Sequence, residues 1–218
     1  MTVSDIDLTN AEAVAAEIVA LGGRSFAVET DISSERQAER LIEATLEHFA
    51  KVDILVNNAG VISTGPLLET SVDVWERTHA VNLKGVFLCT KAVFPALMAQ
   101  CSGRIINIAS VAGKRGGGFF GNTCYASSKG GVIAFTKGAA REAGPYNITV
   151  NAIAPAMIET EMISGMPPGV RESLLRSIPL GRTGSVENVA AAVCFLASDG
   201  AGFITGEIMD VDGGLMMD

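Results

Sequence analysis

Strand-like and helix-like segments alternate along almost the whole chain, and this alternation limits the possible folds more than any other feature of the sequence. Apolar residues recur at helical spacing from residue 9, a short strand-like run follows at 24–29, and the same order returns at 34–49 and 54–56. A strand, a helix and a second parallel strand connect in a right-handed crossover. The order therefore predicts an α/β fold with a doubly wound parallel sheet.

The rest of the chain continues the pattern without a linker or repeat that would divide it. Helix starts are marked by a capping-box pattern from Thr9 to Glu12, by Ser34 and by Ser185, and Gly22-Gly23 ends the first helix. Three prolines and four glycines within 156–184 predict a loop with short helices. The other expected elements are a helical region at 71–98, a strand at 104–109, a helix at 125–144, a buried strand at 148–153, a helix at 186–197 and a strand at 207–211. We therefore expect a single domain over residues 1–218.

Charge and hydropathy argue against two classes of partner. The chain of 218 residues has 16 Lys and Arg against 24 Asp and Glu, so its net charge of -8 would repel a nucleic-acid backbone. No apolar run reaches the roughly 18 residues that a membrane-spanning helix needs. The first ten residues carry acids where a signal peptide carries bases. We expect a cytoplasmic protein with no nucleic-acid or membrane partner.

Four cysteines, Cys89, Cys101, Cys124 and Cys194, lie among apolar or small residues and form no Cys-x-x-Cys pair. This distribution is typical of buried, reduced thiols rather than of disulfides. The sequence therefore predicts no metal centre.

Tyr125 and Lys129 are four residues apart at the start of a predicted helix, so both side chains lie on one helix face. A free phenol has a pKa near 10, whereas proton transfer at neutral pH needs a group whose pKa is near 7. An adjacent ammonium would lower the pKa of the phenol by stabilising the phenolate. The same spacing occurs by chance in many helices, so the pair carries weight only together with its neighbours.

Several residues stand beyond the carboxyl ends of strands, where such sheets bind ligands. Ser110 follows the strand at 104–109 and is placed to donate to a substrate oxygen. Asn82 is an amide within a mostly apolar helical stretch, which favours a hydrogen-bonding task over a surface position. Asn58-Ala59-Gly60 lets a ligand approach the backbone, although a plain turn has the same composition. Asp31 fits either a helix cap or a ligand contact.

Taken together, these motifs resemble the short-chain dehydrogenase/reductase family, and the resemblance covers essentially the whole chain. The motifs are Asn57-Asn58-Ala59-Gly60, Asn82, Ser110, Tyr125-Ala126-Ser127-Ser128-Lys129, Asn151-Ala152-Ile153-Ala154-Pro155, Ile204-Thr205-Gly206 and Asp212-Gly213-Gly214. The resemblance implies a Rossmann-like fold, a nicotinamide cofactor and direct hydride transfer between that cofactor and a substrate carbon.

The resemblance also implies a role for each matching residue. Tyr125 would exchange a proton with the carbonyl or alcohol oxygen, and Lys129 would lower the phenol's pKa and bind the nicotinamide ribose. Ser110 would hold the substrate oxygen, and Asn82 would position a water that connects Lys129 to solvent. The implied cofactor contacts are Asp5, Asn58, Ala59 and Gly60 at the adenosine ribose, Asp31 and Ile32 at the adenine, and Tyr125, Lys129, Pro155, Ala156, Ile158 and Thr160 on the nicotinamide side.

The largest departure from the family lies near the N-terminus. Family members begin with a strand and a glycine-rich turn whose amides hold the pyrophosphate, whereas the first glycines here, Gly22 and Gly23, end a helix. By analogy a strand, loop and helix on the order of 30 residues long is absent. The strand would lie between those ending near Ser4 and Val56, so its absence would leave two unpaired edges. Either the natural chain is longer, or this is a shortened relative that binds its cofactor weakly.

Asp5 bears on the choice of cofactor. It would accept a hydrogen bond from a free 2'-hydroxyl and repel a 2'-phosphate, and no basic residue precedes Arg24. The sequence therefore predicts NAD, with NADP as the alternative, because the absent loop is a place where a base could stand.

Three functions remain open at this point. The first is an oxidoreductase of a small secondary alcohol or ketone, with a substrate mouth formed by residues 63–67, 116–120 and 157–176. The second is a beta-ketoacyl-acyl-carrier-protein reductase, an activity that usually uses NADPH and needs a basic surface for its acidic carrier. The third is a non-catalytic subunit that pairs with full-length relatives through the helices at 71–98 and 125–144. We expect a homo-dimer or homo-tetramer.

Overall fold

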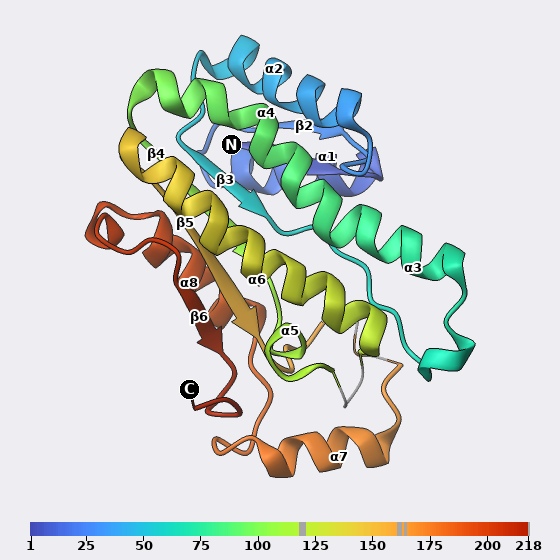
Figure 1. The fold of residues 1–218 in the computed structure, drawn as a ribbon. Helices are drawn as coiled ribbons and strands as arrows, with labels where there is room; N and C mark the ends of the chain where they lie inside the picture. Colours follow the sequence, from blue (N-terminus) through green and yellow to red (C-terminus); the bar gives the residue numbers. More distant parts are fainter. Residues whose placement is uncertain (118–120, 161–162, 164, 218) are drawn as a thin grey trace.

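The computed structural model describes residues 1–117, 121–160, 163 and 165–217. Every strand pair in these residues is parallel, and helices flank the strands (Figure 1). The predicted single-domain α/β fold of Rossmann-like type is thereby confirmed.

The larger sheet has the strand order β3–β4–β5–β6 and carries most of the core. Its strands are β3 (Ile54–Asn57), β4 (Gly103–Ile108), β5 (Ile148–Pro155) and β6 (Ile208–Val211). All side chains of β5 except that of Pro155 are buried, as expected for a parallel strand covered on both faces.

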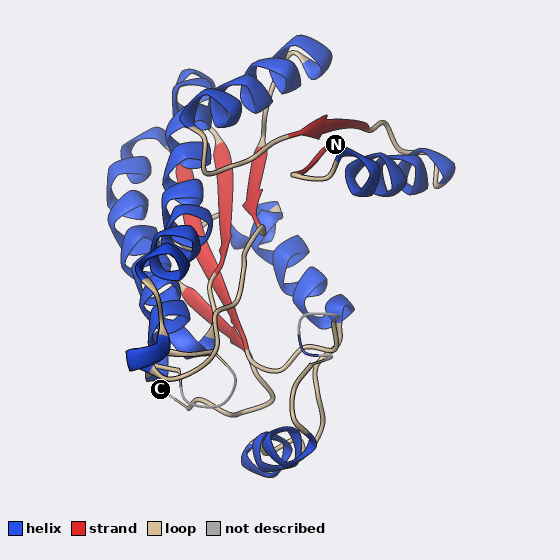
Figure 2. Ribbon diagram, turned by 90° about the vertical axis from the view of Figure 1, so that its right-hand side faces the viewer, coloured by secondary structure: helices blue, strands red, loops and turns tan. Residues whose placement is uncertain are grey.

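Helices lie on both faces of the larger sheet (Figures 1 and 2). On one face α4 (Gly85–Gln100) and α6 (Thr123–Ala143) pack against the strands, and on the other lies α8 (Val186–Ala197). Leu97 of α4 joins Ile105 and Val150 in one apolar cluster. Leu196 of α8 joins Ile106 in another. The opposite directions of Ile105 and Ile106 follow from the alternation of side chains along a strand.

A second, two-stranded sheet contains β1 (Thr2–Asp5) and β2 (Phe26–Glu29), with α1 (Leu8–Ala20) packed against it. Figure 2 shows these strands to one side of the larger sheet. Within the described residues no backbone ladder joins β1 to β3. Ile54 and Val56 of β3 are 45% and 40% exposed. The described part of the chain therefore leaves one edge of β3 without a strand partner.

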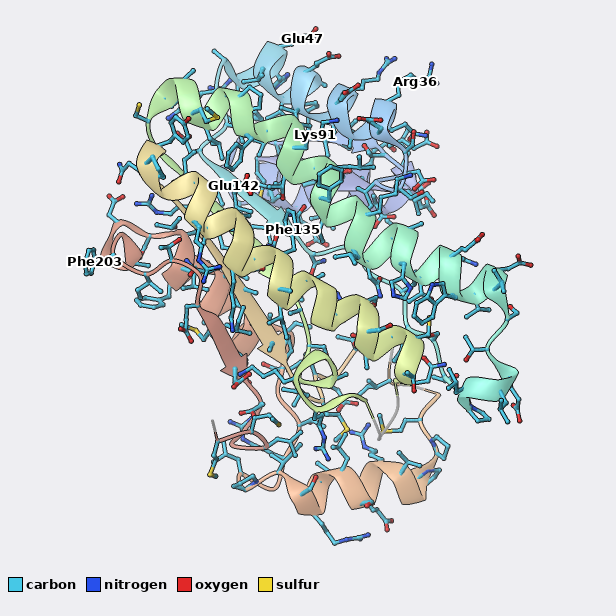
Figure 3. All side chains as sticks on the ribbon, in the orientation of Figure 1. Arg36, Glu47, Lys91, Phe135, Glu142 and Phe203 are labelled. Carbon is cyan, nitrogen blue, oxygen red and sulfur yellow. The ribbon has the colours of Figure 1, made fainter. Side chains whose placement is uncertain are left out.

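α2 (Glu35–Phe49) packs against α4 through the predicted apolar stripe, of which Ala38, Leu41 and Ile42 are buried. Lys91 lies where α4 faces α2 (Figure 3), and its Nζ is 2.7 Å from a Glu35 carboxylate oxygen. Ser34 is the N-cap residue of α2, as the sequence predicts.

Several predicted boundaries were wrong. α1 begins at Leu8 because the carboxylate of Asp7 accepts the Thr9 N–H at 2.9 Å, so Asp7 caps the helix and Thr9 lies inside it. The strand expected at 24–29 is limited to β2. The region expected at 71–98 consists of α3 (Val72–His79), a π-helical turn (Ala80–Lys84) and α4. The short α5 (Val111–Arg115) and α7 (Pro168–Ser177) complete the helices described in the middle of the chain.

The helical stretch Val72–Gln100 is long and apolar enough, by composition, to cross a membrane, which the sequence analysis did not expect. Of its most apolar 18-residue window, 44% is buried inside the protein, as in the core helix of a globular fold. The thiols also differ from expectation. Cys89 and Cys124 are buried, whereas Cys101 and Cys194 are exposed, and all four are free.

Candidate functional site

A cavity of about 1060 Å³ opens at the carboxyl ends of the strands, between the two sheets. Ser110, Tyr125 and Lys129 line it together with every residue that the sequence assigned to the cofactor. These residues are Asp5, Asp31, Ile32, Asn58, Ala59, Gly60, Pro155, Ala156, Ile158 and Thr160, in addition to Tyr125 and Lys129 themselves. The fold thus gathers around one space side chains that are far apart in the sequence.

Ser110 stands directly after β4, where it is the N-cap residue of α5. Its Oγ accepts a hydrogen bond from the Ala112 N–H at 3.1 Å, and its backbone is extended. A serine in this position satisfies a free amide of the helix start while its hydroxyl stays at the cavity wall.

The first turn of α6 places Tyr125. Asn122 caps the helix: its Oδ1 accepts the Tyr125 N–H at 3.0 Å and the Ser63 hydroxyl at 2.6 Å. Tyr125 and Lys129 then follow one helical turn apart on the face that meets the cavity. Asn122 therefore holds the loop after β3, which contains Ser63, against the start of α6.

The Tyr125 side chain lines the cavity and is partly buried. Burial raises the pKa of the phenol, because it disfavours the phenolate, and the Ser110 hydroxyl lowers that pKa only in part. The sequence analysis expected Lys129 to bring this pKa down. In the protein alone the net pKa of the phenol is raised instead, because desolvation is the largest influence on Tyr125.

The Lys129 side chain is almost completely enclosed, with 4% of the residue's surface exposed. Its Nζ donates to the Ile108 carbonyl oxygen at 2.7 Å. Burial lowers the pKa of this amine to about 8, because the ammonium is taken out of water and meets one neutral acceptor. The amine can therefore gain and lose a proton at mildly alkaline pH.

Asn82 does not line the cavity but lies directly behind it, fully buried in the π-helical turn. Its Oδ1 accepts the Val61 N–H at 2.8 Å, and its Nδ2 donates to the Val61 carbonyl at 2.8 Å and to Ser128 Oγ at 3.0 Å. This amide therefore has the hydrogen-bonding task that its apolar surroundings suggested. A Cβ at Gly60 would lie 3.3 Å from Asn82 Oδ1 and 3.4 Å from Lys129 Nζ, so glycine permits a close approach there.

The carboxylates of Asp5 and Asp31 are at the part of the cavity formed by β1, β2 and the turns that follow them. Asp5 Oδ1 accepts the Asp7 N–H at 2.9 Å. Asp31 Oδ1 accepts both the backbone N–H and the hydroxyl of Ser33, at 2.9 and 2.7 Å. Both aspartates therefore stabilise turns and also face the cavity.

Sequence reasoning missed several cavity residues, including Arg77 and the two groups that follow. Thr30 lines the cavity with a buried Oγ1 that makes no hydrogen bond within the protein, and a threonine at a strand end carries no distinctive sequence signal. The second group is the apolar wall from α8, which looks like ordinary core in the sequence. It contains Val186, Val189, Ala190, Val193 and Cys194.

Two segments of the expected substrate mouth lie partly outside the described residues. The substrate mouth was expected to include 116–120 and 157–176, and of these residues 118–120, 161, 162 and 164 lie outside the described residues. Ile158, Thr160 and Ile163 of the second segment line the cavity.

Among the described residues, His, Cys, Asp and Glu side chains form no group of three that could hold a metal ion.

Comparison with known proteins adds an independent finding. A family model described as enoyl-(acyl carrier protein) reductase matches residues 1–216. A 3-oxoacyl-[acyl-carrier-protein] reductase of Synechocystis is 45% identical over 210 residues, which are 96% of this chain and 83% of that protein. The corresponding reductase of Thermotoga maritima is 39% identical over 213 residues, 98% of this chain and 86% of that protein. One from Staphylococcus epidermidis is 40% identical over 207 residues, with shares of 95% and 84%.

Proposed function

Because this chain belongs to the short-chain dehydrogenase/reductase family, we propose that it reduces a 3-oxoacyl thioester carried on an acyl carrier protein. The chain is an NAD(P)-dependent oxidoreductase; the substrate is the proposed part. The relatives that support it are named for this reaction and cover nearly the whole chain. The structural observation that supports this reaction is that Ser110, Tyr125 and Lys129 line one cavity.

This proposal replaces the sequence's first interpretation, a small secondary alcohol or ketone. Asp5 and the net charge of -8 argued against this activity, but net charge says nothing of how charge is distributed locally. Arg171 and Arg176 lie on α7, and Arg182 follows it. This region lies near the carboxyl ends of β5 and β6 (Figure 1). Arg171 and Arg176 pair with Glu159 and Glu172, so a carrier-binding surface near the cavity depends on the exposed Arg182.

The cavity fits a dinucleotide in size and in the chemistry of its two ends. Its volume is at the upper limit of the roughly 300–1,000 Å³ typical of ligand pockets. The carboxylates of Asp5 and Asp31 offer hydrogen-bond acceptors to an adenosine. Lys129 offers a donor to the ribose at the other end. Gly60 is the one glycine among the lining residues, so no glycine-rich turn of the described chain faces a pyrophosphate there.

We propose NAD as the preferred cofactor, on electrostatic grounds. Asp5 and Asp31 would both repel the 2'-phosphate of NADP, whereas an aspartate accepts from a free ribose hydroxyl. This preference separates the chain from the NADPH use that the sequence analysis attached to the beta-ketoacyl reductase activity.

The proposed chemistry divides among three side chains. Bound nicotinamide supplies a hydride to the substrate carbon. Ser110 and Tyr125 donate hydrogen bonds to the carbonyl oxygen, and the Tyr125 phenol gives that oxygen its proton, so ketone becomes alcohol by gain of a hydride and a proton. Lys129, held by the Ile108 carbonyl, stabilises the phenolate that remains. Asn82 holds the Val61 backbone behind Lys129.

The experiment is a substrate comparison on the purified chain, with Tyr125→Phe as the matched control. NADH and NADPH consumption are measured with an acetoacetyl thioester of acyl carrier protein, the same thioester of a pantetheine fragment, and a simple ketone. Turnover of the carrier-bound thioester that falls by about 10²-fold or more in Tyr125→Phe supports the proposal. Turnover of the ketone alone overturns the proposed substrate. A folded wild-type protein that is inert with all three favours the non-catalytic subunit instead.

A further inference from the structure

Four polar side chains form one layer inside the apolar core between the larger sheet and its covering helices. Asn57 of β3 and Asn107 of β4 are directly opposite each other in the parallel ladder. Thr90 of α4 and Thr136 of α6 face them, and all four residues are buried. We call these four residues the polar layer.

The polar layer separates two apolar clusters on the same side of the sheet. Along β4, Ile105 belongs to the first cluster and Ala109 to the second, with Asn107 between them. Along α6, Ala140 and Val132 belong to the same two clusters, with Thr136 between them. The polar groups on strand and helix therefore stand at one height in an otherwise apolar interface.

The hydrogen bonds of the polar layer form a donor-to-acceptor chain that leads from β3 through β4 to α6. Asn57 Nδ2 donates to Asn107 Oδ1 at 2.8 Å and to Thr90 Oγ1 at 3.3 Å. Asn107 Nδ2 donates to Thr136 Oγ1 at 2.9 Å, and the Thr136 hydroxyl donates to the Val132 carbonyl at 2.8 Å. Asn107 must therefore both accept and donate, which leucine and ionised aspartate cannot do.

Buried polar groups contribute little net stability, but a misaligned one is costly because it loses its partner inside the core. Apolar side chains alone would let a helix slide along a sheet with little penalty, whereas a polar contact at one height selects one register. We propose that the polar layer fixes the position of α6 along the sheet, and that Asn107 and Thr136 are positioning residues for Tyr125 and Lys129.

The connection to the site is short. Thr136 follows Lys129 by two helical turns, about 10.5 Å along the same face. Asn107 immediately precedes Ile108, whose carbonyl accepts the Lys129 Nζ–H. Strand β4 therefore holds α6 at two heights, through Asn107 to Thr136 and through Ile108 to Lys129. A shift of α6 along its axis breaks the first contact and separates Tyr125 from Ser110.

The test measures the surroundings of the phenol directly and requires no turnover. The chain has two tyrosines, Tyr125 and Tyr146, so carbon-13 labelling at tyrosine Cζ gives two NMR signals, which Tyr146→Phe assigns. Each signal is titrated with pH in the wild type, in Thr136→Val and in the double variant Asn107→Leu/Thr136→Val. The double variant removes both partners of the Asn107–Thr136 contact, and the buried Asn57 amide keeps its 3.3 Å contact with Thr90 Oγ1.

If the polar layer sets the register, the Tyr125 signal of the double variant broadens or splits. Its titration then moves from the raised pKa of the partly buried phenol toward the ordinary value of about 10, while Tyr146 is unchanged. Thr136→Ser keeps the hydroxyl and restores the wild-type titration. Thr78→Val is the matched control, because among the described residues the buried Thr78 hydroxyl bonds the Val74 carbonyl of its own helix and no other group.

A double variant that is folded and gives a wild-type Tyr125 titration and line width overturns the proposal. Should the double variant not fold, Thr136→Val is compared with Thr136→Ser. A Tyr125 titration and line width that are the same in both variants then overturn the proposal. The inference concerns the side chains on which the proposed function rests. The readout is the titration of Tyr125, which does not depend on turnover. The register proposal can therefore fail in an active enzyme, and it can be confirmed in a protein that has no activity.

Discussion

Gly113 lies against the backbone of Lys129: a Cβ built at Gly113 would be 2.6 Å from the Lys129 carbonyl carbon and 2.9 Å from its oxygen. The same Cβ would be 2.7 Å from the Gly130 nitrogen. Helix α5, whose N-cap residue is Ser110, is thus in direct backbone contact with the segment of α6 that carries the lysine. Because the neighbouring atoms belong to backbone, a side chain at Gly113 could be accommodated only by moving one of these helices.

Gly113→Ala should therefore lower turnover by about 10²-fold or more by separating Ser110 from Tyr125, since small misplacements of catalytic groups have effects of this size. Gly138→Ala on the same helix is the control: nothing lies within 4 Å of its Cβ, and alanine should stabilise the helix by about 0.5–1 kcal/mol. Turnover and thermal unfolding are measured for both. A Gly113→Ala protein as active as the wild type would show that α5 and α6 do not need this close contact.

Asp5 should determine the cofactor preference. Asp5→Ser removes the carboxylate that faces the cavity and should shift the ratio of NADPH to NADH binding toward NADPH by about tenfold, or roughly 1.4 kcal/mol. The control is Asp7→Ser, which also removes a carboxylate but from a residue that caps α1 and does not line the cavity. Dissociation constants from calorimetry with both dinucleotides provide the measurement. Equal shifts in the two variants would assign the effect to net charge alone.

The same calorimetric titration tests the hypothesis of weak cofactor binding. No glycine-rich turn of the described residues faces the cavity, so the pyrophosphate would lack the amides that usually hold it. We expect a dissociation constant for NAD that is weaker than micromolar for these 218 residues. Micromolar affinity would show that other groups hold the pyrophosphate.

The free edge of β3 should make the protein prone to association. Ile54 is an exposed, branched apolar residue on a strand with an unpaired side in the described chain, which is a template for pairing between molecules. Ile54→Lys should reduce light scattering on heating and change the free energy of unfolding by no more than about 0.5 kcal/mol. Ile105→Val, in the buried core, should instead cost about 0.5–1.5 kcal/mol. A cost above about 2 kcal/mol for Ile54→Lys would mean that this edge is covered in solution.

The alternation of strands and helices was enough to predict the fold, because each element buries an apolar face of recognisable period. The site residues could be named because their motifs together resemble those of the short-chain dehydrogenase/reductase family; the spacing of Tyr125 and Lys129 alone was not specific enough. What could not be predicted depends on contacts between distant backbones. The Ile108 carbonyl that receives Lys129 carries no sequence signal, since every residue has a carbonyl. The preference for a small alcohol or ketone relied on Asp5, on net charge and on the apolar or small residues of the expected substrate mouth, and the comparisons do not support it.

The polar layer was also invisible in the sequence. Asn57 was noted only as part of a turn motif, and Asn107 and Thr136 lie in a strand and a helix where a single polar residue does not interrupt the pattern. Their partnership depends on the parallel register of β3 with β4 and on the packing of α6, neither of which a single sequence specifies. The direction of the Tyr125 pKa was missed for a related reason, because the depth of burial is a property of the assembled fold.

Lys129 should lower the stability of the folded protein at neutral pH. Its pKa falls from 10.5 to about 8 because of burial. Between these values the unfolded chain holds a proton that the folded protein has released, so the free energy of unfolding rises with pH across this window. The 2.5-unit difference corresponds to about 3 kcal/mol. Below pH 8 the folded protein bears the whole desolvation cost of the ammonium.

Lys129→Met removes that cost together with the hydrogen bond to Ile108, which is worth about 1.5–3 kcal/mol for a charged donor. We therefore expect the variant to be more stable than the wild type at pH 7, by up to about 1.5 kcal/mol, although it loses turnover. Its advantage should disappear by pH 10, where the wild-type amine is neutral in the folded state. Urea unfolding of both proteins at pH 7, 8.5 and 10 measures the difference. Parallel stability profiles would show that Lys129 keeps its ordinary pKa in the folded protein, and that the cavity wall around its ammonium is open to water.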